Sequence, residues 1–351
     1  MSTLTIALAS LGGIVLAGIV AQGAWQARKA GPKRAEMQPA VNEPREPVMD
    51  AIAGGDADAE SPAELREPMP ERRANRRIVQ RLDALIDSIA TLSVEAPVSG
   101  AFAITHMPTT RRAGGKPFMV EGLNSETGEW EFPVASQRYG EFQAGVQLAN
   151  RTGALNEIEY SEFVQKIQSF AEGIGAFAQF PDMLEAVAAA RELDNFAGQH
   201  DAQLAVRLKA RAAAWSVGYI QQHAGRHGFV PGVVPGRLVL PSSEEGAPPV
   251  LTLTFDSQAA LADDPNLSAV RDVTLSFDVP QTEAKAQPFA SWQASAQALA
   301  TGMDASIVDD HGRPLSTEGF AAIGNELGQL YAALEGRDLA AGSAAARRLF
   351  S

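Results

Sequence analysis

Cysteine is absent from this 351-residue chain, which excludes disulfide bonds, thiolate metal sites and a cysteine nucleophile. Basic residues are also scarce relative to acidic ones: 29 Lys and Arg against 42 Asp and Glu give a formal net charge of −13. This balance argues against a nucleic-acid-binding protein, which normally has a basic face. Aromatic residues make up only 7% of the chain, but hydrophobic residues make up 45%, which is enough for a folded protein. The length suits about two domains.

Charge is missing altogether from residues 1–27. Within this segment, residues 4–24 form an apolar run of 21 residues. As a helix, this run would extend about 31 Å, enough to cross a hydrocarbon core of about 30 Å. We therefore expect a single transmembrane anchor over residues 1–27. A cleaved signal peptide is the alternative, but no basic residue precedes the apolar run, as such peptides require.

Positive charge begins directly after the apolar segment. Because Lys and Arg are retained in the cytoplasm, the pattern predicts a single-pass inner-membrane protein with its N-terminus outside and its C-terminal part cytoplasmic. The four cations are Arg28, Lys29, Lys33 and Arg34. Small residues at four-residue spacing also allow two such helices to pair as a homodimer. They are Ala9, Gly13, Ala17 and Ala21.

Proline and acidic residues dominate residues 28–77, which show no apolar periodicity. Such a stretch cannot bury enough apolar surface to offset the entropy lost on ordering, so we expect a disordered linker. Its C-terminal end carries a basic cluster, which is either the solvated face of a lead-in helix or a contact with anionic lipid. The cluster consists of Arg72, Arg73, Arg76, Arg77 and Arg81.

Residues 78–351 alternate short strands with amphipathic helices, which predicts an α+β body. Residues 250–255 (VLTLTF) and 273–279 (VTLSFDV) show the clearest alternation, typical of antiparallel strands with one polar face. Helical spacing of apolar residues predicts five helices. They cover residues 161–173, 182–197, 212–223, 289–303 and 316–334.

A weak internal repeat divides this body. Phe163 and Trp292 occupy similar places 129 residues apart, and residues 176–180 and 305–309 share that offset. We interpret the repeat as two β-α-β-β-β-α units in tandem, although two Ala-rich halves could look alike by chance. The predicted parts are a first α+β unit (78–200), a C-terminal α+β domain (201–340) and a tail (341–351).

No set of residues has the spacing of a known catalytic or cofactor site, so we predict a binding protein rather than an enzyme, with no cofactor and no metal. His223 and His227 are four residues apart, but no acidic residue completes an H-E-x-x-H pattern. The G-I-G run at 173–175 follows a helix rather than the strand that a dinucleotide loop needs. Asp309 and Asp310 are best interpreted as a turn that leaves a strand.

One face of the second predicted sheet is polar. If the helices pack against the apolar face, alternate residues of three strands lie on the other face. A sheet face without a helical cover is either solvated or a docking surface for a partner. The candidate docking residues are Arg237, Val239, Thr252, Thr254, Thr274 and Ser276.

The order of these segments resembles the ZipA family, the membrane tethers of the tubulin-like division GTPase FtsZ. An apolar segment ends in W-Q-A-R-K (25–29), and a proline-rich linker and an α+β domain follow it. The densest match covers residues 203–335. There, DVTLSFDVP (272–280) is followed by ASWQASAQALATGM (290–303) and then by ASIVDDHGRPLST (305–317).

The resemblance implies a split β-α-β fold whose open sheet face holds the C-terminal peptide of FtsZ at midcell. The six candidate residues would then be the peptide-binding positions, and the inner membrane would be the other partner. Family members hold the peptide largely through apolar contacts, whereas only Val239 of the six is aliphatic here. An anchored envelope scaffold with another protein partner therefore stays a second hypothesis, and a membrane-tethered enzyme a third. Residues 78–200 are not covered by the resemblance and form an extra unit.

Overall fold

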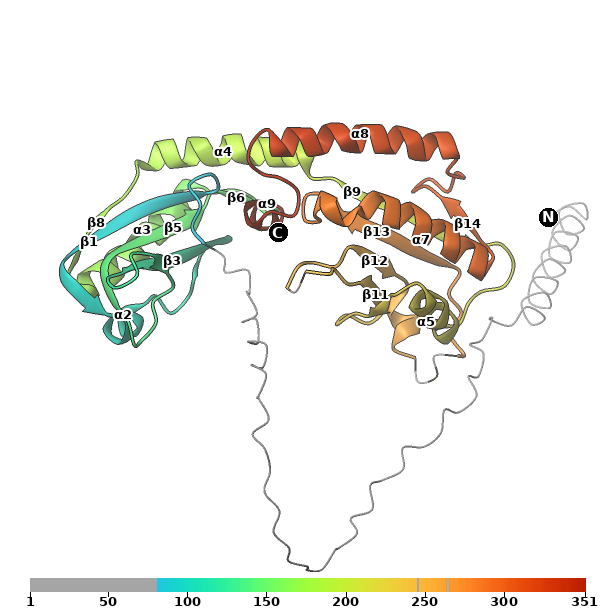
Figure 1. The fold of residues 1–351 in the computed structure, drawn as a ribbon, viewed down its shortest axis with the longest axis horizontal. Helices are drawn as coiled ribbons and strands as arrows, with labels where there is room; N and C mark the ends of the chain where they lie inside the picture. Colours follow the sequence, from blue (N-terminus) through green and yellow to red (C-terminus); the bar gives the residue numbers. More distant parts are fainter. Residues whose placement is uncertain (1–80, 245, 263, 265) are drawn as a thin grey trace, which may run out of the picture.

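A computed structural model describes residues 81–351 except 245, 263 and 265 (Figure 1). The described chain combines helices with antiparallel sheets, so the predicted α+β class is confirmed. The predicted anchor (1–27) and linker (28–77) lie outside the described residues. Within the described part of the chain, no helix is both long enough and apolar enough to cross a membrane.

The first unit has a six-stranded antiparallel sheet in which β1 lies next to the edge strand β8. The strand order is β2-β3-β5-β1-β8, with β4 paired to β3, and β6 pairs with β7 in a small separate hairpin. The elements are β1 (Asp87–Ser99), α2 (Gly100–His106), β2 (Arg112–Ala113), β3 (Lys116–Asn124), β4 (Trp130–Glu131), β5 (Arg138–Gln147), β6 (Ala149–Asn150), β7 (Gly153–Ala154), α3 (Glu157–Ile174), β8 (Ala176–Gln179) and α4 (Met183–His200).

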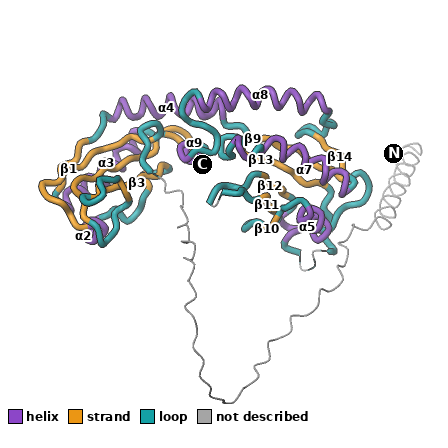
Figure 2. Tube along the Cα trace, in the orientation of Figure 1, coloured by secondary structure: helices purple, strands orange, loops and turns teal. Residues whose placement is uncertain are grey.

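The second unit has a sheet of six strands in the order β10-β11-β12-β13-β9-β14. Helices α5, α6 and α7 and the short η1 lie between these strands, and α8 and α9 follow the last strand (Figure 2). The elements are β9 (Gln203–Ala210), α5 (Val217–Arg226), β10 (Val230–Pro231), β11 (Arg237–Leu240), β12 (Leu251–Thr254), α6 (Ser257–Ala260), β13 (Asp272–Asp278), η1 (Ala284–Ala286), α7 (Pro288–Met303), β14 (Ala305–Val308), α8 (Thr317–Glu335) and α9 (Ala344–Leu349).

Both units place their first strand in the same surroundings. β1 lies between β5 and β8, and β9 lies between β13 and β14. A helix precedes each edge strand: α3 ends at Gly175 (φ +70°) and α7 at Asp304 (φ +55°), both left-handed. A left-handed residue at a helix C-terminus turns the chain sharply, so each helix leads directly into β8 or β14. These two strands start 129 residues apart.

Local sequence explains the helices that cover the sheets. Asn156 caps α3 by accepting hydrogen bonds from the backbone of Ile158 and Glu159, and the Glu159 side chain accepts from the backbone N–H of Asn156. This reciprocal cap satisfies amides that the first turn leaves free. Apolar residues at intervals of three or four then face the sheet, among them Phe163 and Ile167 of α3.

The C-terminal residues 341–351 do not form the predicted tail. Leu349 and Phe350 are buried in the hydrophobic core of the first unit, together with Leu339. Arg348 of α9 donates hydrogen bonds to both carboxylate oxygens of Asp87 in β1, at 2.8 and 2.5 Å. No local pattern could indicate this packing, because Asp87 lies 261 residues before Arg348 in the sequence.

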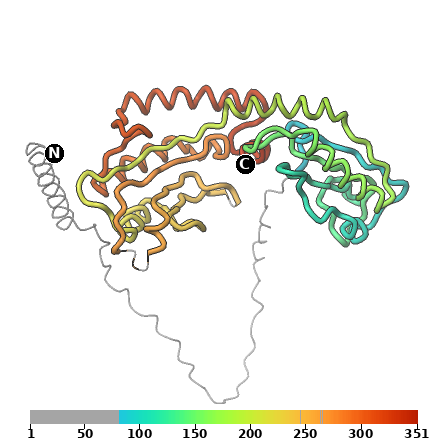
Figure 3. The backbone as a smooth tube through the Cα atoms, turned by 180° about the vertical axis from the view of Figure 1, so that it is seen from behind, coloured from blue at the N-terminus to red at the C-terminus, as the bar shows by residue number. Residues whose placement is uncertain are grey.

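The chain therefore crosses between the units twice, first from α4 to β9 and then back from α8 to α9. α4 and α8 run along the same side of the molecule in both views (Figures 1 and 3). Arg337, just after α8, forms an ion pair with Glu192 of α4 at 3.2 Å. Arg151 of the first unit is hydrogen-bonded to Asp201 at 2.5 Å and to Asp278 of β13 at 2.7 Å.

Candidate functional site

The six predicted docking residues lie in two rows across neighbouring strands of the second sheet. In the first row, Val239 of β11 opposes Thr252 of β12, which opposes Ser276 of β13. The row continues to Ala205 of β9. Because opposing residues in antiparallel strands point to the same face, these side chains form one continuous line.

The second row runs beside the first. Arg237 opposes Thr254, Thr254 opposes Thr274, and Thr274 opposes Arg207 of β9. The structure thus brings all six predicted residues together on one face, as strand alternation requires. It also adds Ala205 and Arg207, which the sequence analysis did not include.

The opposite face of the same sheet forms the core of the second unit. Leu253 of β12 and Leu275 of β13 are fully buried, and Trp292 of α7 donates its indole N–H to the carbonyl of Leu275 at 2.9 Å. Along β13 the residues alternate between half-buried and buried without interruption. The docking face therefore keeps solvent contact while helix α7 packs against the other side.

Three open hollows lie along this face, over β11, β12 and β13. A hollow of about 520 Å³ includes Val239 and Arg237, and a second of about 410 Å³ includes Arg237 and Thr252. A third of about 430 Å³ includes Thr254 and Thr274. Arg237 borders the first two hollows and Thr254 the last two, so the hollows form one continuous path.

Arginine 237 is the charged group at the middle of this path. Its guanidinium donates a hydrogen bond to Thr252 Oγ1 at 3.3 Å, and its side chain is exposed. Within the described residues no carboxylate pairs with it, whereas Arg207 on the same face forms an ion pair with Asp272 at 3.2 Å. Arg237 can therefore bind an anionic group of a ligand without first leaving an internal ion pair.

The residues considered for metal binding or acid–base chemistry have other surroundings. The ring of His223 packs at a tilt against Tyr219 with a centroid distance of 4.3 Å, and His227 is the C-cap of helix α5. Asp309 accepts hydrogen bonds from the backbone of His311 and Arg313 in a turn, and these bonds lower its pKa. Across the described chain, no three metal-ligating side chains come together.

The first unit has an equivalent polar face, but its own chain lies on it. Leu82 lies so close to Gly145 of β5 that a Cβ at Gly145 would be only 2.4 Å from Leu82 Cδ2. The backbone N–H of Leu82 also donates to Glu121 of β3 at 3.1 Å, and Gln143 donates to the same carboxylate at 2.8 Å. The segment around Leu82 therefore covers this face, whereas no described segment covers the second one.

Sequence analysis missed the residues beyond the edge of the second sheet. Val233 and Val234 lie in the turn between β10 and β11, and they line the largest of the three hollows. A signal was present, because two adjacent valines stand between Pro-Gly pairs in a segment whose turn residues are normally polar. Comparison with known proteins finds no family model that matches the chain and no significantly similar curated protein.

Proposed function

We propose that this chain is a membrane tether that binds the C-terminal peptide of FtsZ on the open face of its second sheet and links FtsZ filaments to the inner membrane. Residues 1–27 would insert into the membrane with the N-terminus outside, and residues 28–77 would connect them to the folded body. The observation that carries the proposal is the solvent-accessible double row on β11, β12 and β13, the face on which the resemblance to the ZipA family places the peptide.

An uncovered sheet face suits a peptide ligand. Its hollows are open and continuous, so they can take successive side chains of an extended segment. The Thr and Ser side chains of the two rows offer hydroxyl groups to that segment, and Val239 offers an apolar contact. No catalytic step is needed for this function.

A tether of this kind does not require a tight single contact. FtsZ polymerises, so many anchored copies can hold one filament at the same time. Each further contact is then effectively intramolecular, with an effective concentration set by the linker. We expect a weak affinity for one peptide and a strong affinity for the polymer.

The direct test is a titration of the full chain in detergent micelles with a labelled C-terminal peptide of FtsZ. We expect wild-type binding and a loss of at least about fivefold in affinity for Val239→Glu, because a charged group replaces an apolar contact. Ile158→Glu is the matched control, since Ile158 is an exposed aliphatic residue in the first turn of α3. Unchanged affinity for Val239→Glu would move the site away from this face.

A second function has one specific observation in its favour. Five of the six docking residues are polar, which suits a more hydrophilic partner than the peptide of the ZipA family. In that case the chain is an anchored envelope scaffold with a different protein partner. Midcell localisation that persists after deletion of the FtsZ tail, together with no binding of the tail peptide, would decide for the scaffold.

A further inference from the structure

An apolar hollow extends the docking face from β11 onto the β10–β11 turn and the loop after β11. Its volume is about 520 Å³, and it reaches from Val239 in the sheet to residues of the flanking turn and loop. Val233 is fully exposed, and Val234 is 55% exposed. Its apolar lining consists mainly of Pro231, Val233, Val234, Val239, Pro241 and Pro249.

The two valines are held by an ordered turn. Gly232 N donates to the carbonyl of Arg237 at 2.8 Å, and Arg237 N donates to the carbonyl of Val234 at 3.1 Å. Gly236 has a φ of +77°, and a Cβ there would lie 2.6 Å from the carbonyl oxygen of Phe255. Only glycine fits this close approach, so the turn displays the valines in a fixed position.

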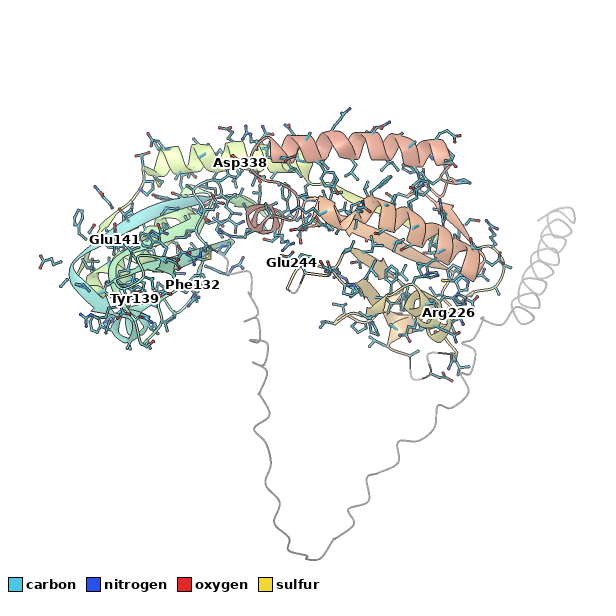
Figure 4. The ribbon with its side chains drawn as sticks, in the orientation of Figure 1. Phe132, Tyr139, Glu141, Arg226, Glu244 and Asp338 are labelled. Carbon is cyan, nitrogen blue, oxygen red and sulfur yellow. The ribbon has the colours of Figure 1, made fainter. Side chains whose placement is uncertain are left out.

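The charges around the hollow restrict its ligand. Glu244 lies on the loop after β11 (Figure 4) and forms an ion pair with Arg347 at 3.1 Å, so the negative charge of Glu244 is balanced within the chain. Arg237 has no carboxylate partner among the described residues, and it lies where the apolar hollow meets the polar rows. In a chain with a net charge of −13, an exposed and unpaired arginine beside an apolar surface favours a ligand with a carboxylate.

We infer that this rim of the second sheet is a two-part specificity site for an extended acidic peptide, in which an aliphatic side chain enters the Val233–Val234–Val239 hollow and a neighbouring carboxylate pairs with Arg237. The inference rests on the proposed function and deepens it, because it names the chemistry that the partner peptide must carry. It also enlarges the apolar contact, which Val239 alone offers within the two rows. The guanidinium can bind the carboxylate with two hydrogen bonds, which fixes the register of the peptide.

The test uses the full chain in detergent micelles and three synthetic versions of the FtsZ C-terminal peptide. One has the natural sequence, one has serine in place of its aliphatic residues, and one has amides in place of its carboxylates. We expect the double variant Val233→Ser, Val234→Ser to weaken the natural peptide about tenfold, because its aliphatic side chain loses its apolar surroundings. The serine peptide should bind both proteins equally weakly.

Arginine 237 is tested in parallel. Arg237→Gln should lower the affinity for the natural peptide by about five- to tenfold and leave the affinity for the amide peptide unchanged, since the lost interaction needs a carboxylate.

Leu184→Ser is the matched control for the valine variant, because Leu184 of α4 is also exposed (68%) but lies in the first unit. Circular dichroism checks that each variant stays folded.

The outcomes separate the two proposals. If the natural peptide binds the wild type and the valine or arginine variants bind it equally well, the rim site is wrong while the tether stays supported. If the double valine variant loses as much affinity for the serine peptide as for the natural peptide, the hollow does not hold the aliphatic side chain, and the inference also fails. If the wild-type chain binds no FtsZ peptide, the proposed function and the inference are both overturned.

Discussion

The first unit covers the polar face of its sheet with its own chain, whereas no described segment lies across the equivalent face of the second unit. Leu92 of β1 and Leu208 of β9 correspond, because their partners Ala178 and Ile307 are 129 residues apart. Gly145 opposes Ile89, which is three residues before Leu92. Ser276 opposes Ala205, which is three residues before Leu208. The two positions are therefore equivalent, and only Gly145 lies against another segment, which carries Leu82.

This difference shows how one topology serves two purposes. A glycine in β5 makes room for a leucine from the lead-in segment, so the first face is used for packing. Serine and threonine at the corresponding positions keep the second face polar and accessible. The core of the first unit also includes buried residues of the C-terminal helix. All buried residues of the second core, in contrast, lie between residues 206 and 327.

The largest expected effect concerns the link between the first unit and the end of the chain. Arg348→Ala leaves the buried carboxylate of Asp87 without its partner, and removal of one partner of a buried pair costs about 3–5 kcal/mol of unfolding free energy. We expect the first unit to unfold at lower urea concentration than the second. Hydrogen exchange measured by mass spectrometry, segment by segment, would separate the two units.

The matched control for this variant is Arg207→Ala. Its ion pair with Asp272 is between a third and a half exposed, so the loss should be about 0–1 kcal/mol. Equal destabilisation by both variants would contradict the difference between the units. So would simultaneous unfolding of both units in the Arg348→Ala protein at every urea concentration.

A smaller effect is expected from valine at the two equivalent positions. Gly145→Val must displace Leu82 from the first face and should cost about 1–2 kcal/mol, partly offset by the better strand propensity of valine. Ser276→Val adds methyl groups to an open face and should change stability by less than about 0.5 kcal/mol. Urea unfolding of both variants measures the difference, and faster amide exchange at residues 82–87 should accompany only the first.

The smallest effect belongs to a hydroxyl group of α8 in the second unit. The Tyr331 hydroxyl is buried and has no hydrogen-bond partner within the described residues, and burial raises its pKa to about 12. Tyr331→Phe should therefore be neutral or stabilise the second unit by up to about 1 kcal/mol.

The raised pKa of Tyr331 also predicts a pH dependence. Below a pH of about 10, the ordinary pKa of tyrosine, the hydroxyl is neutral in the folded and unfolded chain, so it adds no pH dependence. Above that pH the unfolded chain loses the proton first, so the wild type should lose stability between about pH 10 and 12. The Phe variant should lose less over this interval in urea titrations, and identical pH profiles would contradict the assignment.

Periodic segments of the fold were predictable from the sequence. The helix expected at 316–334 is found at Thr317–Glu335, and the alternating strand at 273–279 is found at Asp272–Asp278. The helix expected at 212–223 instead begins at Val217, because Ser216 caps it and Trp215 pairs with Val270 in an isolated bridge. Apolar periodicity alone could not locate that start.

Contacts between distant segments were not predictable in this way. Helix α9 has six residues and no long apolar pattern, and its position depends on Asp87, which a single sequence does not pair with it. The candidate site shows the same division. Strand alternation placed the six docking residues on one face, but the hollow at Val233 and Val234 depends on how the turn lies beside β11, which no periodicity encodes.

The return of the C-terminus to the first core has a consequence for how the protein is made. A ribosome delivers residues 87–200 well before Leu349 and Phe350, which complete the core of the first unit. Domains usually fold in the order in which they are synthesised. In this protein the second unit can fold while the first unit still lacks α9. A fluorescent reporter inserted next to α9 would disturb the packing of Leu349 and Phe350, so it belongs elsewhere on the chain.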